Sequence, residues 1–451
     1  MFLSCLLLAA ALDGEAALRH ASALAALGPH PWGSSRAPVA AEYVASQFRA
    51  VGLQEVRLQA FESHGIRGSN AIGVLRAPGP EFVVLGAHHD TAPAAPGAYD
   101  DGGGVGVLIE AARVLARQPS RPRTLVFASF DGEEAWSTGK TTTAGSRAYV
   151  ESLGSEARNM TAAFVVEMSG FKGGTPVLHP IAYADPLGPG RSVIAPGWLV
   201  KATLAGAREG GSPLGIGDPL LGWLYQPAVR TFRVRLYGDD LSFVQAGLPA
   251  VFASDSSFSA FYPWYHQATD TADKLDAGAL GRMGASVLAS VAALERMPRG
   301  SGADPVWFAV GGRVLGGGWL YALGALCVLP SLVLSLSQGG AAIGARSLQA
   351  ALFALLLWRH PVPVLWVFLL PSLFTPARRR WLSALSLLPL LALLALGAGA
   401  ARRGYVSGVW LAPWELAVAV GAFALLWLRP PPTSARVPKR TRGRAPARRF
   451  R

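Results

Sequence analysis

The hydrophobic and polar positions of the first 300 residues follow two periods in turn, one typical of helices and one typical of strands. Apolar residues recur at helical spacing over residues 16–27 and 37–51, and they alternate with polar residues over 54–61 and 70–75. Apolar runs and the same periods then predict strands at 82–87, 124–130, 162–166, 230–237 and 249–253, and helices at 105–115, 145–153 and 276–295. Residues 173–222, rich in Gly and Pro, receive no assignment. Strands interleaved with helices predict an α/β fold with a mixed, mainly parallel sheet flanked by helices.

Beyond residue 297 the pattern changes to long apolar segments. Residues 316–336, 381–401 and 407–428 each hold about the twenty residues that a helix needs to cross about 30 Å of hydrocarbon. Residues 348–374 are long enough for one span, but Arg359-His360-Pro361-Val362-Pro363 interrupts them, so they form a kinked span or a short hairpin. We therefore expect a C-terminal α-helical transmembrane domain with four spans, or five if the interrupted segment crosses twice.

These changes divide the chain into five regions. Residues 1–12 are apolar, too short to span a bilayer and not preceded by a basic residue, so they are a signal remnant, a wrongly assigned start or simply the first helix. The expected regions are an apolar N-terminal segment with the first helix at 1–29, the α/β domain at 30–297, a linker at 298–315, a multi-span transmembrane domain at 316–428 and a basic disordered tail at 429–451.

Charge is distributed unevenly between these regions. The 451 residues are 51% hydrophobic and carry a formal charge of +13. Residues 1–300 hold 24 Lys and Arg against 26 Asp and Glu, whereas residues 301–451 hold 17 against 2. The excess cations lie between and after the apolar segments, where they orient spans and meet anionic headgroups, so we expect a lipid bilayer and no nucleic acid as a partner. Only Cys5 and Cys327 occur, and they leave the compartment undecided.

Side chains that can bind a metal follow the ends of the predicted strands. His88 and Asp90 follow the strand at 82–87, and Asp100 lies in a small-residue loop before the next helix. The other candidates are Glu133, Glu134, Glu167 and, far downstream, His266. Ligands gather where strands end in α/β units, and nitrogen and carboxylate groups without thiolates suit zinc or a similar divalent ion. Asp90 apart, these are six candidate ligands, and five ligands are already too many for one catalytic zinc. Two ions that share a carboxylate would use five of them and leave one carboxylate free to move protons.

Several of these residues also have a purely structural interpretation. Isolated histidines are expected to be solvated or hydrogen-bonded, and His89 to fill a packing position. The pair Glu133-Glu134, taken alone, is typical of an exposed charged turn. The pair Asp100-Asp101 before three glycines suits a plain turn, whereas a phosphate loop is disfavoured because adjacent carboxylates repel phosphate.

Five short motifs occur in order along the α/β domain. They are Gly86-Ala-His-His-Asp-Thr, Pro96-Gly-Ala-Tyr-Asp-Asp, Phe130-Asp-Gly-Glu-Glu, Val166-Glu-Met and Tyr265-His-Gln-Ala-Thr-Asp-Thr. Together they resemble the co-catalytic di-zinc aminopeptidase family of the aminopeptidase Y type, with glutamate carboxypeptidase and glutaminyl cyclase as more distant kin. The following apolar segments make the chain similar to the membrane-anchored endoplasmic reticulum metallopeptidase branch, which also has glutamate where other members have aspartate at position 167.

The resemblance implies a pair of zinc ions that share one carboxylate. His88, Glu167 and one oxygen of Asp100 would bind the first ion. His266, Glu134 and the other oxygen of Asp100 would bind the second. The fold must then bring together side chains that lie far apart in the chain.

The resemblance also implies two residues that act beside the metal ligands. Glu133 would be the general base that takes a proton from the attacking water and delivers it to the leaving amine. Asp90 lies two residues after His88, on the same side of an extended strand, and would orient that imidazole.

The sequence departs from the family's pattern at two places. Tyr99 precedes the acidic pair and three glycines follow it, where the family commonly has Asp-Asp-Asn-Ala-Ser-Gly. The alignment makes Asp100 the shared ligand, with Asp101 as the alternative, and the family has a cis peptide bond after this aspartate. Further on, Asp239-Asp240 stands where relatives have Ser-Asp-His, so Asp239 receives no role.

The sequence therefore predicts a membrane-anchored zinc metallopeptidase, most simply an aminopeptidase acting on peptide substrates. Two alternatives stay open, a catalytically inactive membrane receptor or scaffold of the same fold and an enzyme similar to glutaminyl cyclase. Four spans would place the catalytic domain with the basic tail in the cytoplasm, and five would place it outside. The branch that the chain resembles faces away from the cytoplasm, so we expect a multi-pass protein with its catalytic domain on the non-cytoplasmic side.

Overall fold

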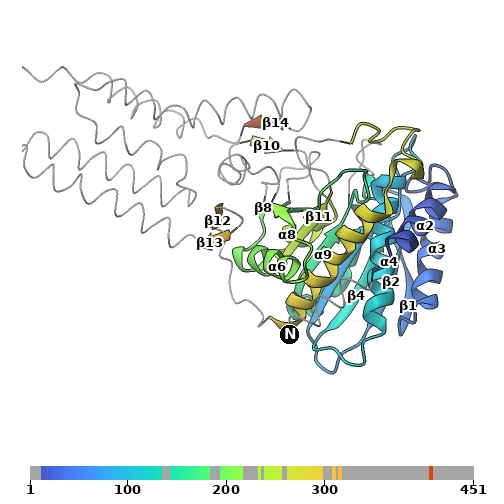
Figure 1. Cartoon of the computed structure of the whole chain (residues 1–451). Coiled ribbons are helices and arrows are strands. Elements are labelled where there is room, and N and C mark those ends of the chain that lie inside the picture. Colours follow the sequence, from blue (N-terminus) through green and yellow to red (C-terminus); the bar gives the residue numbers. More distant parts are fainter. Residues whose placement is uncertain are drawn as a thin grey trace, which may run out of the picture.

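The computed structural model of the chain describes an α/β domain and three pairs of short strands (Figure 1). The described residues are 12–134, 143–182, 193–216, 232–234, 238–255, 262–297, 307–310, 313–316 and 406–409. The three short pairs are β7 (Ile181–Ala182) with β8 (Val193–Ile194), β10 (Phe232–Val234) with β14 (Val406–Val409), and β12 (Trp307–Val310) with β13 (Arg313–Gly316).

The α/β domain is built on a mixed sheet of eight strands. Its strands lie in the order β1 (Glu55–Ser63), β2 (Ile66–Leu75), β4 (Thr124–Phe130), β3 (Phe82–His88), β5 (Met160–Val166), β11 (Ala250–Ser254), β6 (Val177–His179) and β9 (Gly215–Ile216). The central strands β4, β3, β5 and β11 are parallel, whereas β2 and β6 pair with them in the antiparallel sense. Every residue of β3, β4 and β5 is buried, because helices cover both faces of these strands.

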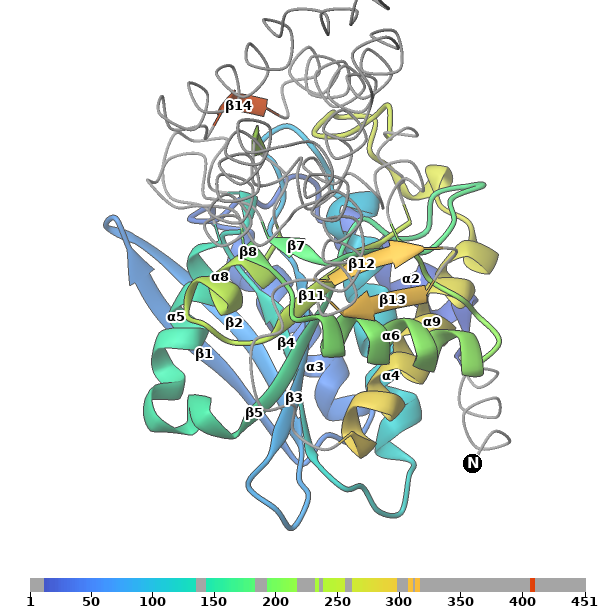
Figure 2. The same cartoon turned by 90° about the vertical axis from the view of Figure 1, so that its left-hand side faces the viewer.

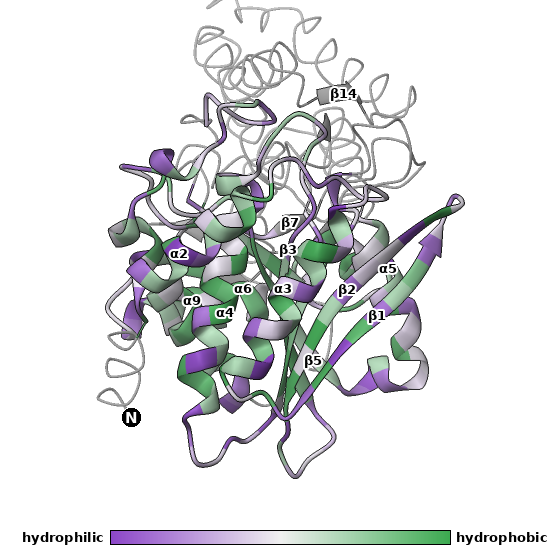
Figure 3. Cartoon of the chain, turned by 90° about the vertical axis from the view of Figure 1, so that its right-hand side faces the viewer, coloured by the Kyte–Doolittle hydropathy of each residue, from purple (hydrophilic) through white to green (hydrophobic). Residues whose placement is uncertain are grey.

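Helices pack on both faces of this sheet (Figure 2). One face carries α2 (Gly14–Ala25), α3 (Ala37–Ala50), α4 (Gly103–Ala116), α6 (Gly197–Glu209) and α9 (Ala277–Arg296), and the other carries α5 (Ala144–Leu153) and α8 (Asp240–Gln245). Short turns of helix are η1 (Ala98–Gly102), η3 (Gly154–Asn159) and η4 (Ala272–Lys274). Successive side chains of a strand point to opposite faces, so Val84 and Leu85 of β3 belong to two different hydrophobic clusters. The central strands are hydrophobic in Figure 3, whereas polar residues lie on the helices.

The predicted mixed α/β fold is confirmed, and most predicted elements agree with the structure to within a few residues. The predicted strand at 124–130 coincides with β4. The unassigned residues 173–222 contain α6 and several short strands. The glycines in this region made the helix difficult to predict from the sequence. Gly206 allows α6 to pack closely against α9, since a Cβ there would lie 2.7 Å from the Ala289 carbonyl oxygen.

The C-terminal predictions are tested at only a few residues. The predicted linker at 298–315 contains β12 and all of β13 except Gly316, and these two strands pair with each other. Val406–Val409, at the start of the predicted span at 407–428, forms β14 and pairs with β10. Apart from these short strands, the predicted spans, residues 1–11 and the basic tail lie outside the described residues.

One described helix, α9, is long and apolar enough to cross a membrane. Buried positions make up 67% of its apolar window. It packs against α2, α4 and α6. Within the described ranges α9 is thus a core helix of the α/β domain. The sequence predicted a helix here, at residues 276–295.

Glu295, near the end of α9, provides a test of the core's electrostatics. Its side chain is buried, and its Oε1 accepts no hydrogen bond from the described residues. Burial raises the pKa of Glu295 to about 7, although Arg121, Arg296 and Arg123 oppose this shift. A carboxyl group whose pKa is raised by folding costs stability once the pH exceeds the unfolded pKa, and the cost is complete above the folded pKa.

We therefore expect Glu295→Gln to raise the melting temperature of the full-length chain by roughly 5 °C at pH 8 and to change it little at pH 4. Thermal melting at the two pH values measures the difference. Glu209→Gln, an exposed position on α6, is the matched control. An equal shift of the melting temperature at both pH values would show that the charge of Glu295 does not destabilise the folded state.

Candidate metal centre

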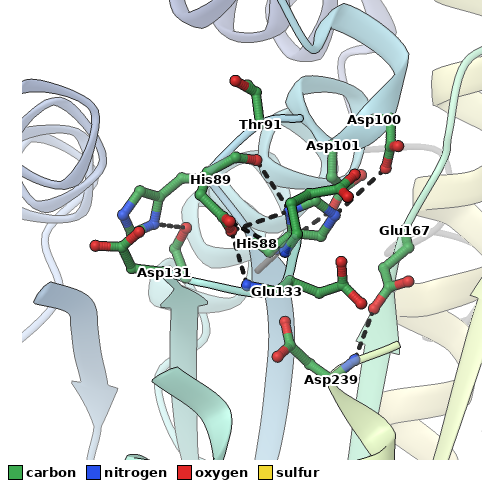
Figure 4. Close-up of polar contacts among 12 residues, drawn as sticks. His88, His89, Thr91, Asp100, Asp101, Asp131, Glu133, Glu167 and Asp239 are labelled. Atoms are coloured by element: carbon green, nitrogen blue, oxygen red, sulfur yellow. Dashed lines mark hydrogen bonds and ion pairs between the residues drawn. The ribbon is translucent and has the colours of Figure 1, made fainter. Parts of the chain in front are cut away.

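The carboxyl ends of the parallel strands place the candidate residues at one edge of the sheet, and Figure 4 shows four of them, His88, Asp100, Glu133 and Glu167. His88 is the last residue of β3, Glu133 and Glu134 follow β4, and Glu167 directly follows β5. Asp100 lies in η1, before α4, and His266 lies in the segment between β11 and α9. The side chains are buried except that of His266, which is 18% exposed.

Asp100 lies between two imidazoles. Its Oδ1 is 3.4 Å from His88 Nε2, and its Oδ2 is 3.4 Å from His266 Nε2. Burial alone would raise the pKa of Asp100, but the two histidines hold it below its usual range. One carboxylate therefore presents an oxygen to each histidine, as a ligand shared by two cations would.

His266 belongs to the more compact half of the site. Its Nε2 is 2.7 Å from Glu134 Oε1, and ligand atoms of Asp100, Glu134 and His266 all lie within 4.8 Å of one another. The Tyr265 ring stacks on the imidazole with 3.6 Å between centroids, which restricts its orientation. Burial lowers the pKa of His266, but Asp100 and Glu134 outweigh it and raise the pKa to about 10. This half of the site therefore attracts positive charge strongly.

The other half of the site, formed by His88, Asp100 and Glu167, is less compact. His88 and Asp100 are in contact, but Glu167 Oε1 accepts a hydrogen bond of 2.9 Å from the backbone N–H of Asp239. Gly238 lies so close to Glu167 that a Cβ there would be 2.1 Å from Oε1. The structure thus places Glu167 beside the site without bringing it into the compact group of ligand atoms.

Asp90 connects His88 with the segment after β4. Its Oδ1 and Oδ2 accept hydrogen bonds of 3.0 Å and 3.1 Å from the backbone N–H groups of Glu133 and Glu134. Its Oδ1 also lies 3.4 Å from His88 Nδ1, the ring nitrogen opposite Asp100. This geometry suits the orienting role that the sequence predicts for Asp90.

Asp101, the alternative shared ligand, is engaged elsewhere. Its Oδ1 accepts hydrogen bonds of 2.9 Å from Gly104 N–H and 3.0 Å from Met168 N–H, and its Oδ2 accepts one of 3.3 Å from His88 N–H. The peptide bond between Asp100 and Asp101 is cis, at the position that the resemblance implies. Asp101 therefore connects η1 with the end of β3 and with the segment after β5, and Asp100 is the residue that faces the histidines.

Glu133 is buried beside the ligands but lies outside the compact group. Its carboxylate points toward Glu167 and Asp239 in Figure 4. Burial raises the pKa of Glu133 well above its usual range, and the neighbouring carboxylates of Glu134, Glu167 and Asp239 raise it further against the effect of His88. A raised pKa makes this carboxylate a better proton acceptor, which suits a general base.

The excess of buried negative charge at this site indicates whether metal cations fit there. Buried carboxylates outnumber the imidazoles of His88 and His266, and burial raises the pKa of Glu134 to about 7. Asp100 Oδ2 accepts no hydrogen bond from the described residues. Buried charge is costly unless it is paired or coordinates a metal. A donor set of imidazole nitrogens and carboxylate oxygens, without thiolates, fits zinc.

His89 packs in the core, as the sequence predicted. Its Nδ1 lies 2.9 Å from Ser129 Oγ, and its side chain is buried. Burial lowers the pKa of His89 to about 3, so the imidazole is neutral at physiological pH. His89 therefore adds no positive charge to the site.

Two carboxylates that received no role in the sequence analysis also lie next to the ligands. Asp239 holds Glu167 through its backbone N–H, and burial raises the pKa of its own carboxyl group to about 7. Asp270 accepts hydrogen bonds from the backbone of η1. The sequence contained a signal for Asp270 only, because it follows His266 by four residues in the same motif.

Known proteins resemble this chain in sequence. The model of Peptidase family M28 matches residues 70–195 and 223–291. Aminopeptidase YwaD of Bacillus subtilis is 37% identical over 82 residues, or 18% of this chain and 17% of that protein. A vacuolar membrane protease of Laccaria bicolor is 29% identical over 196 residues, or 40% of this chain and 18% of that protein. The aligned region thus spans less than a fifth of the length of either relative.

The fold also resembles solved structures. BSAP, a zinc aminopeptidase from Bacillus subtilis, matches with a TM-score of 0.50 at 17% identity over 62% of this chain and 94% of that chain. At this identity the match shows a shared fold, a mixed sheet flanked by helices like that of zinc aminopeptidases. The regions that match the model of Peptidase family M28 contain the candidate ligands from His88 to His266.

Proposed function

We propose that this chain is a membrane-anchored aminopeptidase that hydrolyses N-terminal peptide bonds with two zinc ions. The position of Asp100 carries the proposal, because its two oxygens each lie 3.4 Å from a different imidazole. His88 and Glu167 would complete the ligands of one ion. Glu134 and His266 would complete those of the other.

Zinc bound at these residues would polarise the scissile carbonyl and lower the pKa of a water molecule. Glu133 takes the proton of the attacking water and delivers it to the leaving amine. Asp90 holds the backbone N–H groups of Glu133 and Glu134 and faces His88 Nδ1, so one carboxylate positions the base relative to a ligand.

The membrane anchor rests on sequence and similarity. Residues 316–428 contain the long apolar segments, and one relative is a vacuolar membrane protease. We propose that the catalytic domain lies on the non-cytoplasmic side. Reporter fusions at Gly302 and after Arg429 distinguish this arrangement from one in which both positions face the cytoplasm.

Hydrolysis of aminoacyl-anilides by the purified full-length chain tests the proposed activity. We expect cleavage of an anilide with a free amino group, and at least about 100-fold slower cleavage of its N-acetylated form. A zinc chelator is expected to abolish cleavage, and added zinc to restore it. Elemental analysis of the untreated protein is expected to give two zinc ions per chain.

The other possible functions have different outcomes in the same experiments. A chain that binds no zinc and cleaves no anilide would be a receptor or scaffold. Cyclisation of an N-terminal glutamine without hydrolysis would indicate an enzyme similar to glutaminyl cyclase. Cleavage of internal bonds in N-blocked peptides would agree with a metallopeptidase activity but exclude an aminopeptidase.

A further inference from the structure

Asp270 contacts both loops that carry the ligands Asp100 and His266. Its Oδ1 accepts a hydrogen bond of 2.9 Å from Tyr99 N–H, and its Oδ2 accepts one of 3.3 Å from Asp100 N–H. Its Oδ1 also accepts a hydrogen bond of 2.9 Å from the Tyr262 hydroxyl group. The side chain is 0% exposed, so solvent does not replace these donors.

Tyr262 and Asp270 stand at the two ends of the segment that carries His266 at its centre. Their hydrogen bond joins these ends. The Tyr262 ring also stacks on the Tyr99 ring with 4.1 Å between centroids, and the Asp270 carbonyl oxygen accepts a hydrogen bond of 3.3 Å from Ala98 N–H. The His266 segment and the η1 loop are therefore fastened to each other next to the compact group of ligands.

We propose that Asp270 is a positioning residue of the metal centre, which sets the Asp100 carboxylate against the His266 imidazole and so raises the affinity for zinc. This inference rests on the proposed function. The Asp270 carboxylate accepts hydrogen bonds from two backbone N–H groups and a hydroxyl group. Only a carboxylate accepts all three, because the NH₂ group of an amide would oppose one of the donors.

Zinc titration of Asp270→Asn in the full-length chain tests this role. Each protein is equilibrated with chelator-buffered zinc, and bound zinc per chain is read by elemental analysis. We expect the zinc affinity to fall about 10- to 100-fold, as is typical when a residue that orients metal ligands is replaced. We also expect kcat to fall at zinc levels that saturate the parent and to recover with excess zinc, while KM stays unchanged.

Asp273→Asn is the matched control, because Asp273 lies in the same segment but is exposed and its carboxylate contacts Thr271 and Lys274. It is expected to bind zinc like the parent.

Tyr262→Phe removes one hydrogen-bond donor to Asp270 and keeps the ring that stacks on Tyr99. It is expected to weaken zinc binding by a smaller factor than Asp270→Asn does.

The outcomes separate this inference from the proposed function. If the parent binds zinc and both Asp270→Asn and Tyr262→Phe bind it equally well, the positioning role is wrong. If Asp270→Asn does not fold, Tyr262→Phe decides alone. A parent that binds no zinc would overturn the proposed function, and this inference with it.

Discussion

Replacing Glu133 by glutamine is expected to lower kcat for peptide hydrolysis by about 10²- to 10⁴-fold, the usual contribution of a general base. Glutamine has nearly the same shape but cannot take a proton from water. The backbone N–H of residue 133 still donates to Asp90, so the positions of the ligands are expected to persist. Anilide hydrolysis measures the loss, and elemental analysis is expected to show unchanged zinc.

Glu151→Gln on α5 is the matched control for this change, because it alters the same chemical group at an exposed position of the same domain. It is expected to leave kcat unchanged. Hydrolysis by Glu133→Gln at the parent's rate would exclude Glu133 as the base. Loss of zinc from Glu133→Gln would instead assign it to the ligands.

The location of the site was predictable because its signals are local. The runs that form β3, β4 and β5 are wholly apolar, and each is followed at once by polar residues. Parallel strands bring such ends to one edge of a sheet, so His88, Glu134 and Glu167 were expected to be near one another. The register of β3 with β4 and with β5 then fixes how far each of these three side chains lies along the strand direction.

The choice between Asp100 and Asp101 required the backbone conformation. Both residues depart from helical φ and ψ inside η1, and their side chains point in different directions. One faces two histidines, and the other accepts hydrogen bonds from three backbone amides. Spacing along the sequence cannot distinguish adjacent residues whose roles are set by a local turn.

The supporting contacts of Asp270 could not be predicted, because their partners are distant in the chain. Tyr99 and Asp270 are separated by 171 residues. Propensity and periodicity describe neighbours within one element, so they assign no role to an acidic residue in an irregular segment. The same limit applies at Val406–Val409, where the length of the apolar segment favoured a span and the pairing partner β10 lies far upstream.

Asp100→Asn is expected to remove both zinc ions together, since one side chain contributes an oxygen to each half of the site. Asparagine is neutral and offers a single oxygen, and its NH₂ group would face one of the two sets of ligands. Bound zinc is expected to fall below about half an ion per chain at concentrations that saturate the parent. Loss of several kcal/mol of electrostatic stabilisation is expected to lower kcat/KM by about 10³-fold or more.

Asp101→Asn makes the same chemical change one residue further on and separates metal binding from folding. Its carboxylate accepts hydrogen bonds from the N–H groups of His88, Gly104 and Met168, so an amide there leaves a buried donor unsatisfied. We expect it to cost about 1–3 kcal/mol of stability while zinc stays bound below the melting transition. Zinc content and thermal melting of both variants decide between the two aspartates. If Asp101→Asn loses both ions and Asp100→Asn keeps them, the shared ligand has been assigned to the wrong residue.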